Sequence, residues 1–121
     1  MHVKNNNYCC DVVIPTCNSG KYITQAINSV ISQTNIKTQI YIIDDGSTDN
    51  TKKLILPLIN RYKNIYYIYQ NNTGLSSARN KGILAGKNHY IAFLDSDDVW
   101  KNNKLIEQFK IFEKSKDQKL G

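Results

Sequence analysis

Residues 40–49 read Ile-Tyr-Ile-Ile-Asp-Asp-Gly-Ser-Thr-Asp, and this stretch decides the fold class. The apolar, mostly β-branched residues 40–43 are typical of a strand, and the acidic pair followed by Gly46 and Ser47 is typical of a turn. The pattern predicts a strand that stops abruptly at Asp44. What lies on either side of it then determines how this strand is built into a sheet.

Strand and helix patterns alternate along the chain on both sides of this stretch. Further strands are predicted over 12–14, 65–69 and 90–94, and helices over 21–33, from Thr48 or Asp49, over 76–85 and from about residue 104. Helices between successive strands favour parallel pairing with crossover connections. The expected fold class is therefore α/β, a three-layer sandwich with a mostly parallel sheet.

Single residues decide several local details of this assignment. Pro15 is expected to close the first strand, because proline cannot continue the hydrogen-bond ladder. Ser19 is expected to cap the first helix, and Pro57 must kink the second helix or shift its start. The third helix is expected to turn small residues toward the sheet so that the two approach closely, its inner side being Leu75, Ala78, Gly82 and Ala85.

Composition excludes several classes of protein. The chain has 121 residues and a net charge of +6, but its lysines are scattered, and neither a basic run nor an aromatic RNA-binding signature occurs, so no nucleic-acid partner is expected. No apolar stretch approaches the ~20 residues that span a bilayer. The N-terminus lacks a secretory apolar run, which favours the cytoplasm. Residues 1–9 are expected to be a flexible segment, and 10–121 one domain.

Carboxylates follow two of the predicted strands. Asp44 and Asp45 end one strand, and Asp95 to Asp98 end another, so the parallel arrangement gathers them along one edge of the sheet. Asp95 and Asp97, one residue apart, can point the same way toward a divalent cation, Mn²⁺ or Mg²⁺, that bridges two phosphoryl groups. The alternative for residues 95–98 is a solvated turn in which aspartate caps the next helix.

Four ordered blocks of sequence extend this pattern from Cys10 to Trp100. They are Val-Ile-Pro-Thr-Cys-Asn (13–18), Ile-Asp-Asp-Gly-Ser-Thr-Asp (43–49), Gly-Leu-Ser-Ser-Ala-Arg-Asn-Lys-Gly-Ile (74–83) and Tyr-Ile-Ala-Phe-Leu-Asp-Ser-Asp-Asp-Val-Trp (90–100). Together they resemble the family 2 glycosyltransferases of the GT-A fold, a Rossmann-like type that binds nucleotide-diphospho-sugars. Gly-rich phosphate loops of nucleotidyltransferases and dinucleotide-binding enzymes are absent after the first strand.

The resemblance implies a set of donor-binding residues. Asp45 would accept a hydrogen bond from the base, typically uracil, and Arg79 would hold the nucleotide near its base or diphosphate. The remaining residues would contact base, ribose, phosphate or metal: Pro15, Thr16 and Asn18 on the base and ribose side, Ser96 on the ribose or phosphate, Asp95 on the ribose or metal, and Asp97 on the metal. Asp44 is expected to orient its turn. The alternatives are an Asx-type turn for Asp45 and a surface ion pair for Arg79.

The function that the resemblance implies is inverting, metal-dependent transfer of a sugar from a nucleoside-diphosphate sugar, with UDP favoured, to an acceptor hydroxyl. The acceptor would be a glycan or lipid-linked glycan in bacterial cell-surface polysaccharide synthesis, with peripheral association at the inner face of the membrane. The general base and the acceptor part are expected beyond residue 121, which leaves the chain a truncated fold. The alternatives are a nucleotide-binding module or inactive fragment, and a nucleotidyltransferase.

Overall fold

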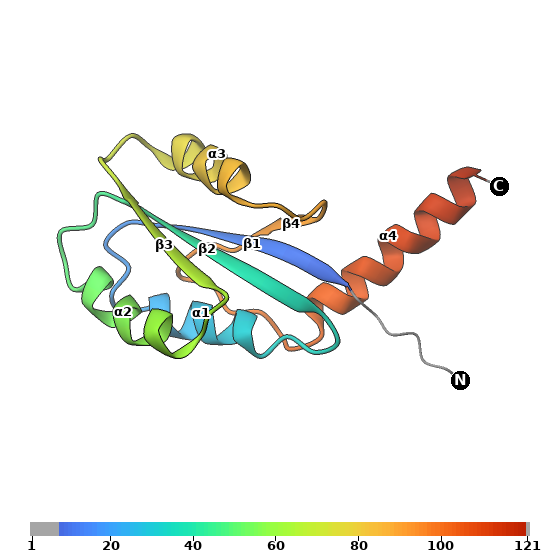
Figure 1. Ribbon diagram of the computed structural model, residues 1–121, viewed down its shortest axis with the longest axis horizontal. Helices are drawn as coiled ribbons and strands as arrows, with labels where there is room; N and C mark the ends of the chain where they lie inside the picture. Colours follow the sequence, from blue (N-terminus) through green and yellow to red (C-terminus); the bar gives the residue numbers. More distant parts are fainter. Residues whose placement is uncertain (1–7, 121) are drawn as a thin grey trace.

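The computed structural model describes residues 8–120, in which a parallel four-stranded sheet has helices on both faces (Figure 1). In chain order the elements are β1 (Cys9–Thr16), α1 (Ile23–Ile31), β2 (Lys37–Asp45), α2 (Thr51–Arg61), β3 (Ile65–Gln70), α3 (Leu75–Ala85), β4 (Ile91–Phe93) and α4 (Lys104–Leu120). The expected flexible segment lies outside the described residues up to residue 7, and Cys9 is already paired in β1.

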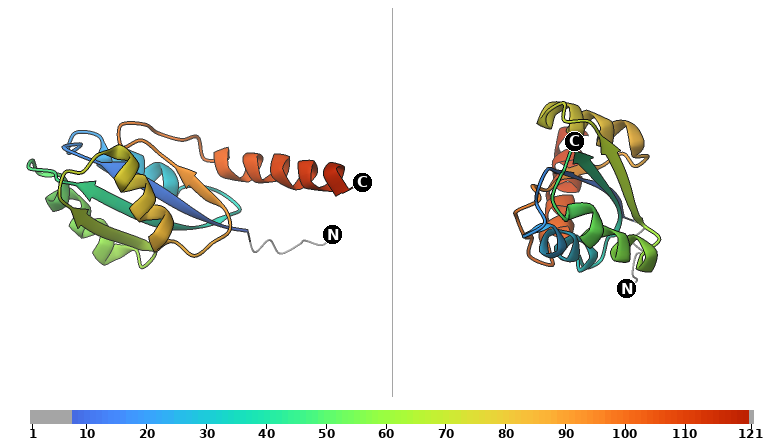
Figure 2. Two further views of the ribbon diagram at one scale, coloured as in Figure 1. Left: turned by 90° about the horizontal axis from the view of Figure 1, so that it is seen from above. Right: turned by 90° about the vertical axis from the view of Figure 1, so that its left-hand side faces the viewer.

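The sheet order is β3-β2-β1-β4, and every neighbouring pair is parallel. Helix α3 covers one face, and α1 and α2 cover the other, as Figure 1 and the second view of Figure 2 show. This arrangement confirms the predicted α/β sandwich of three layers. It also places β1 and β2 at the centre, so the segments that leave their carboxyl ends lie side by side.

Alternating side chains of the central strands divide the core in two. Val12 and Ile14 pack with α1 and α2, whereas Val13 and Ile43 pack beneath α3 against Ala78. All five side chains are completely buried. Period-two burial on both faces explains why these strands read as continuous apolar runs rather than as alternating ones.

Pro15 does not end β1, contrary to the expectation. It pairs in register with Ile43, and β1 continues to Thr16. The amide of Asp11 and the carbonyl of Val13 bond toward β4, so Pro15, two residues further on, faces the same side. Because β4 ends at the level of Val13, the missing N–H of Pro15 leaves no ladder partner unsatisfied.

The predicted helix caps are also corrected. The carbonyl oxygen of Ser19, not its hydroxyl, accepts the Tyr22 and Ile23 amides at the start of α1, which has no side-chain cap. Helix α2 begins at Thr51, and of the two predicted caps it is Asp49 whose side chain accepts the Thr51 amide, at 3.0 Å, whereas Asn50 makes no side-chain cap bond. Since the hydroxyl of Ser19 is not used for capping, it is available for a contact elsewhere.

Two further local predictions have mixed outcomes. Pro57 lies within α2, exposed, and does not shift the start of the helix to a later residue. On α3, Ala78 and Gly82 are buried against the sheet as predicted, but Leu75 is 50% exposed. The close approach of α3 therefore depends on two small residues one turn apart.

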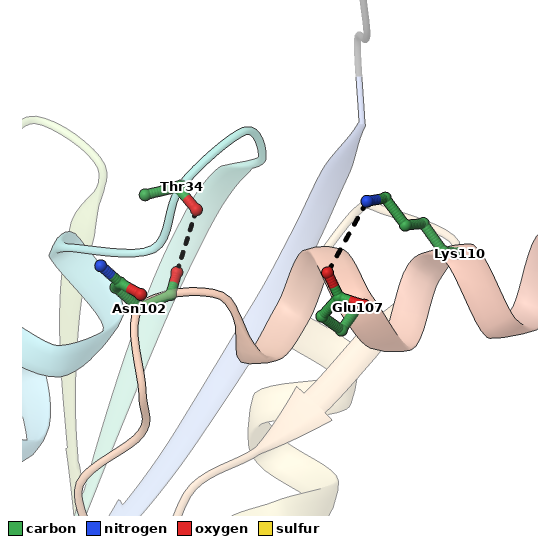
Figure 3. A network of polar contacts seen from close by, with 4 residues as sticks. All are labelled: Thr34, Asn102, Glu107 and Lys110. Atoms are coloured by element: carbon green, nitrogen blue, oxygen red, sulfur yellow. Dashed lines mark hydrogen bonds and ion pairs between the residues drawn. The ribbon is translucent and has the colours of Figure 1, made fainter.

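Helix α4 projects away from the sheet (Figure 2), and its first half is attached to the rest of the chain: Phe109 packs in the core against Tyr90, whose hydroxyl also bonds Glu113. The Gln33 side chain accepts the amide of Leu105 at 3.0 Å and donates to the carbonyl of Lys101 at 2.7 Å. Figure 3 shows the neighbouring bond from the Thr34 hydroxyl to the carbonyl of Asn102. No helix among the described residues is long and apolar enough to cross a membrane.

Candidate functional site

The carboxyl ends of β1, β2 and β4 bring the predicted site residues to one edge of the sheet. Thr16 ends β1 beside Asp44, and Asp45 is the last residue of β2. Both aspartates belong to β2, which therefore runs two residues beyond the predicted strand over 40–43. Successive strand residues point to opposite faces, and the two carboxylates therefore have different surroundings.

Asp45 is 6% exposed and fixes the loop that follows β3. Its Oδ1 accepts the Thr73 amide and the Gln70 side-chain amide, both at 2.9 Å, and its Oδ2 accepts the Gly74 amide at 2.9 Å. Burial acts to raise the pKa of Asp45, but these hydrogen bonds outweigh it and hold the pKa below its ordinary value. The group is therefore an ionised acceptor at neutral pH.

Asp44 orients the turn after β2, as predicted. Its Oδ1 accepts the Ser47 amide at 2.9 Å and its Oδ2 accepts the Tyr67 hydroxyl at 2.6 Å. The turn needs glycine at position 46, where φ is +83° and a Cβ would lie 3.0 Å from the backbone nitrogen of Asn72. Asp44 is completely buried and its carboxylate is directed at protein groups.

Asn18 joins the loop after β1 to the loop before α2. It adopts a left-handed backbone with φ of 51°, and its side-chain oxygen accepts the amides of Thr48 at 2.8 Å and Asp49 at 3.2 Å. Its own amide donates to the Ser47 hydroxyl. The side-chain oxygen of Asn18 is thus occupied by the protein, so its contribution to a ligand site is the shape of the loop.

A small cavity of about 120 Å³ lies where these elements converge. Its lining consists of Pro15, Thr16, Cys17, Asp45, Leu75 and Ala78. Thr16 is 3% exposed, and its hydroxyl oxygen is buried without a hydrogen-bond partner in the described part of the chain. Because Thr16 is in register with Asp44 and follows Ile14 by two residues, its side chain points to the α1/α2 side of the sheet, away from Ala78.

Arg79 lies on α3, next to the cavity-lining Ala78. Its Nε is buried without a partner, and its guanidinium carbon lies 5.8 Å from the ring centroid of Phe93 in β4. No carboxylate among the described residues forms an ion pair with it, so the alternative of a surface ion pair is not observed. The cationic group is held against an aromatic face between the cavity and the end of β4.

Asp95, Ser96 and Asp97 follow β4 in a turn closed by the Asp98 amide on the Asp95 carbonyl. The side chains of Asp95 and Asp97 are exposed and form no ion pair with a side chain in the described part of the chain. Among residues 8–120, no three acidic, histidine or cysteine side chains are grouped as a metal site. Two free carboxylates nevertheless fit Mg²⁺ or Mn²⁺, since such ions are held by one or two carboxylates plus phosphate and water.

Ser96 is linked to the loop after β1. Its hydroxyl lies 2.6 Å from the hydroxyl of Ser19, whose amide in turn donates to the Thr51 hydroxyl. The structure therefore gathers Pro15, Thr16 and Asp45 around one cavity. The Asp95–Asp97 turn is connected to the loop that lines it through Ser19, which the sequence predicts as a helix cap.

Sequence reasoning missed the partners of the acidic residues. Gln70 and Thr73 hold Asp45, and Tyr67 holds Asp44. These groups come from β3 and its following loop, more than twenty residues further along the chain. The signal that could have found them is topological, because β3 pairs with β2 and its end must lie beside Asp45.

Larger cavities lie elsewhere. One of about 870 Å³ is lined by β2 and β3 residues such as Tyr41 and Tyr66, and others of about 550 and 400 Å³ lie between β4 and α4. No carboxylate lines any of these three. A cavity of about 470 Å³ is lined by Asp98 and Glu107 together with Lys101 and Lys104, and by no residue of β1 or β2. The small cavity lies where β1 and β2 end and holds the ionised Asp45, and we therefore take it as the candidate site.

Curated relatives are similar over most of this chain. It is 42% identical over 105 residues to an uncharacterised glycosyltransferase of Nostoc sp., covering 86% of this chain and 33% of the relative. It is 37% identical to TuaG of Bacillus subtilis, a putative teichuronic acid biosynthesis glycosyltransferase, covering 80% of this chain and 39% of TuaG. The chain thus spans well under half the length of these relatives.

Solved structures agree with the fold. The crystal structure of residues 1–349 of Staphylococcus aureus TarS matches with a TM-score of 0.78 and 28% identity, over 87% of this chain and 32% of that fragment. The same TarS fragment has been solved in complex with UDP and with UDP-GlcNAc. The family model described as "Glycosyl transferase family 2" matches residues 11–119, which is most of the chain. The chain belongs to glycosyl transferase family 2.

Proposed function

We propose that this chain is the donor-binding part of a metal-dependent glycosyltransferase that uses a nucleoside-diphosphate sugar, with UDP as the nucleotide. The observation that carries the proposal is the cavity between the ends of β1 and β2 and the start of α3, which the ionised Asp45 lines. The TarS structures with UDP and UDP-GlcNAc support the same ligand class. Residues 10–121 would form this donor-binding domain.

Asp45 supplies the base selectivity in this proposal. A carboxylate has about four lone-pair positions, and the hydrogen bonds of Asp45 are unevenly distributed between its oxygens. Oδ1 takes its donors from Gln70 and Thr73, whereas Oδ2 takes only the Gly74 amide. Oδ2 therefore retains capacity for one more donor, such as the imide N–H of uracil. Cytosine has no N–H at that ring position and would leave the acceptor unpaired, at a cost of about 1–3 kcal/mol.

The other cavity residues would hold the base and ribose. Pro15, Thr16 and the loop shaped by Asn18 would form the wall against the base and ribose. Ser96 and Asp95 lie on the ribose and phosphate side. A ribose contact would make UDP bind more tightly than dTDP, although both bases carry the same imide.

Asp97 and Asp95 would hold a divalent cation, Mn²⁺ or Mg²⁺, on the diphosphate. When bound, such an ion stabilises the negative charge that builds on the departing nucleotide. The two exposed carboxylates provide its protein ligands, and the unpaired guanidinium of Arg79 provides further positive charge at the diphosphate. Both contributions act on the leaving group, so they favour cleavage of the sugar bond.

Transfer to an acceptor hydroxyl with inversion needs a general base. We assign the base and the acceptor surface to the part of the full-length relatives that this chain does not match, which is more than half of their length. The name of TuaG supports a glycan or lipid-linked acceptor in cell-surface polysaccharide synthesis. Such a role would place the whole enzyme in the cytoplasm at the inner face of the membrane.

The experiment is thermal unfolding of the chain with UDP, dTDP, CDP and GDP, each with and without Mn²⁺. A ligand at a hundred times its Kd stabilises the native state by about 2.7 kcal/mol, which a small domain shows as several degrees in Tm. UDP with Mn²⁺ should give the largest shift, and Asp97→Asn should remove the metal-dependent part. The matched control is Asp98→Asn, the same charge change one residue away, which should leave it intact.

The outcome also separates the alternatives. Stabilisation by UDP without turnover by a longer chain would favour the nucleotide-binding module, and preferential stabilisation by a nucleoside triphosphate would favour a nucleotidyltransferase. If no nucleotide moves the Tm at concentrations up to the millimolar range, the donor-site assignment is wrong.

A further inference from the structure

The hydroxyl of Ser19 occupies a central position between two parts of the candidate site. Ser19 is 9% exposed, and its Oγ lies 2.6 Å from the Oγ of Ser96 and 3.3 Å from the carbonyl oxygen of Cys17. Its amide donates to the Thr51 hydroxyl at 3.0 Å. The side chain is therefore fixed from the β1 and α2 side and reaches across to the turn after β4.

This contact is the one hydrogen bond, among residues 8–120, that joins the loop after β1 to the Asp95–Asp98 turn. The loop after β1 carries Cys17, which lines the cavity. Ser96 stands between Asp95 and Asp97, the two proposed metal ligands. A change in the Ser19–Ser96 contact would therefore move the carboxylates of Asp95 and Asp97, because these residues are the chain neighbours of Ser96.

The far end of the same segment is held independently. Gln33 binds the carbonyl of Lys101 and the amide of Leu105, and Thr34 binds the carbonyl of Asn102 through both its amide and its hydroxyl (Figure 3). The near end, residues 95–98, is closed by the Asp98 amide on the Asp95 carbonyl. Ser19 then joins this turn to the loop after β1 through Ser96.

The geometry also favours one direction for the two hydroxyl hydrogens. If Ser19 donates to the carbonyl of Cys17 and Ser96 donates to Ser19, both hydrogens are used within the protein. The lone pairs of Ser96 are then free for the ribose or phosphate side. The reverse direction would leave the carbonyl of Cys17 without this donor.

We propose that Ser19 is a positioning residue that couples nucleotide binding to cation binding, by holding Ser96 and its flanking carboxylates in register with the cavity. The inference rests on the proposed function, since it presumes a nucleotide in the cavity and a cation on Asp95 and Asp97. This role differs from a purely structural one in one respect. Loss of the Ser19 hydroxyl reduces the gain in nucleotide affinity that the metal causes, while the affinity for the nucleotide without metal stays the same.

The test is isothermal titration of UDP into the 121-residue chain, with Mn²⁺ and with EDTA, for the unaltered protein and for Ser19→Ala. One net hydrogen bond corresponds to about a fivefold change in an equilibrium constant. The ratio of UDP affinities with and without Mn²⁺ should therefore fall about fivefold in Ser19→Ala. The affinity measured in EDTA should stay within about twofold.

The matched control is Ser29→Ala. Ser29 is also buried, at 8% exposure, and its hydroxyl donates to the carbonyl of Ala26 within α1, so the substitution removes one buried hydroxyl away from the site. It should lower the Tm but leave the Mn²⁺ effect unchanged. Ser96→Ala provides a second variant, at the partially exposed end of the contact. Adding Ser19→Ala to Ser96→Ala should not reduce the ratio of UDP affinities with and without Mn²⁺ any further.

The results separate the two levels of the proposal. A full Mn²⁺ effect in Ser19→Ala, or an equal loss of UDP affinity with and without Mn²⁺, overturns the coupling role and leaves the donor site standing. Failure of the unaltered chain to bind UDP, or to bind it more tightly with Mn²⁺, overturns the proposed function and the coupling role together.

Discussion

The close contact between α3 and β1 gives a prediction that can be worked out in detail. A Cβ built on Gly82 would lie 2.3 Å from Cγ1 and 2.8 Å from Cγ2 of Val13. Both residues are buried, and the contact sits at the middle of the sheet. A methyl group at position 82 therefore cannot be accommodated unless the helix or the valine moves.

Two opposing effects determine the cost of Gly82→Ala. Overpacking of a core costs about 1–3 kcal/mol, whereas alanine in place of glycine inside a helix gains about 1 kcal/mol. The net loss of stability should be about 0–2 kcal/mol. Val13→Ala removes two methyl groups at about 0.8 kcal/mol each plus a cavity cost, in total about 2–3 kcal/mol.

The double variant isolates the contact. In Val13→Ala/Gly82→Ala the new methyl group enters the space that the valine methyl groups leave, so the combined loss should be at least about 1 kcal/mol smaller than the sum of the single losses. Urea unfolding followed by far-UV circular dichroism measures all three free energies. Asn80→Ala, at an exposed position of the same helix, serves as the control for helix propensity.

Additive losses within about 0.5 kcal/mol would refute the reasoning, because additivity means that the two residues do not share a contact. A net gain of about 1 kcal/mol from Gly82→Ala alone would refute it as well. Either result would mean that α3 lies farther from the sheet. Arg79 and the first residues of the helix, which border the cavity, would then lie farther from the sheet as well.

Two further predictions concern buried carboxylates. The folded-state pKa of Asp45 lies below its ordinary value, so the stabilisation it provides is complete above about pH 4 and is lost as the pH falls through the lowered pKa. Asp45→Asn should flatten the acid limb of stability measured by urea unfolding between about pH 6 and pH 2, and an unchanged limb would contradict this. Asp11 is completely buried and accepts both the backbone and the side-chain amide of Asn88, at 2.9 and 2.8 Å. Asp11→Ala leaves both donors unpaired and should cost about 2–5 kcal/mol in the same assay; a loss below 1 kcal/mol would show that the loop between α3 and β4 is held otherwise.

Local sequence patterns predicted the order of strands and helices because the spacing of apolar residues along the chain matches the side chains that each strand or helix buries. Residues 40–43 read as a strand since each is enclosed between helices, and the small residues of α3 predicted its approach to the sheet. The four sequence blocks predicted the family through their resemblance to its pattern. Three of them contain the end of a strand, and the fourth lies on α3.

Contacts between distant segments could not be predicted in this way. The donors to Asp45 come from Gln70 to Gly74, and the group that binds the first turn of α4 is Gln33, 72 residues before Leu105. Ser19 was taken for a helix cap because serine before an apolar helix usually is one. In the folded chain its hydroxyl is 2.6 Å from Ser96, a partner 77 residues away.

The exceptions also have physical reasons. Pro15 remains within β1 because its side of the strand faces the region beyond the end of β4. Leu75 is exposed because it is the first residue of α3, beside the cavity and beyond the part of the helix that packs on the sheet. Neither fact depends on local propensity, so neither was accessible before the sheet order was known.

The most direct test of the donor-site assignment is a map of amide NMR signals during titration with UDP, first with Mg²⁺ and then with paramagnetic Mn²⁺. UDP should shift the signals of Cys17, Thr73 and Gly74 around the cavity, and Mn²⁺ should broaden the signals of the turn containing Asp97 when UDP is present. The largest shifts at Tyr41, in the largest cavity of the sheet, or broadening that spares the Asp97 turn, would contradict the account.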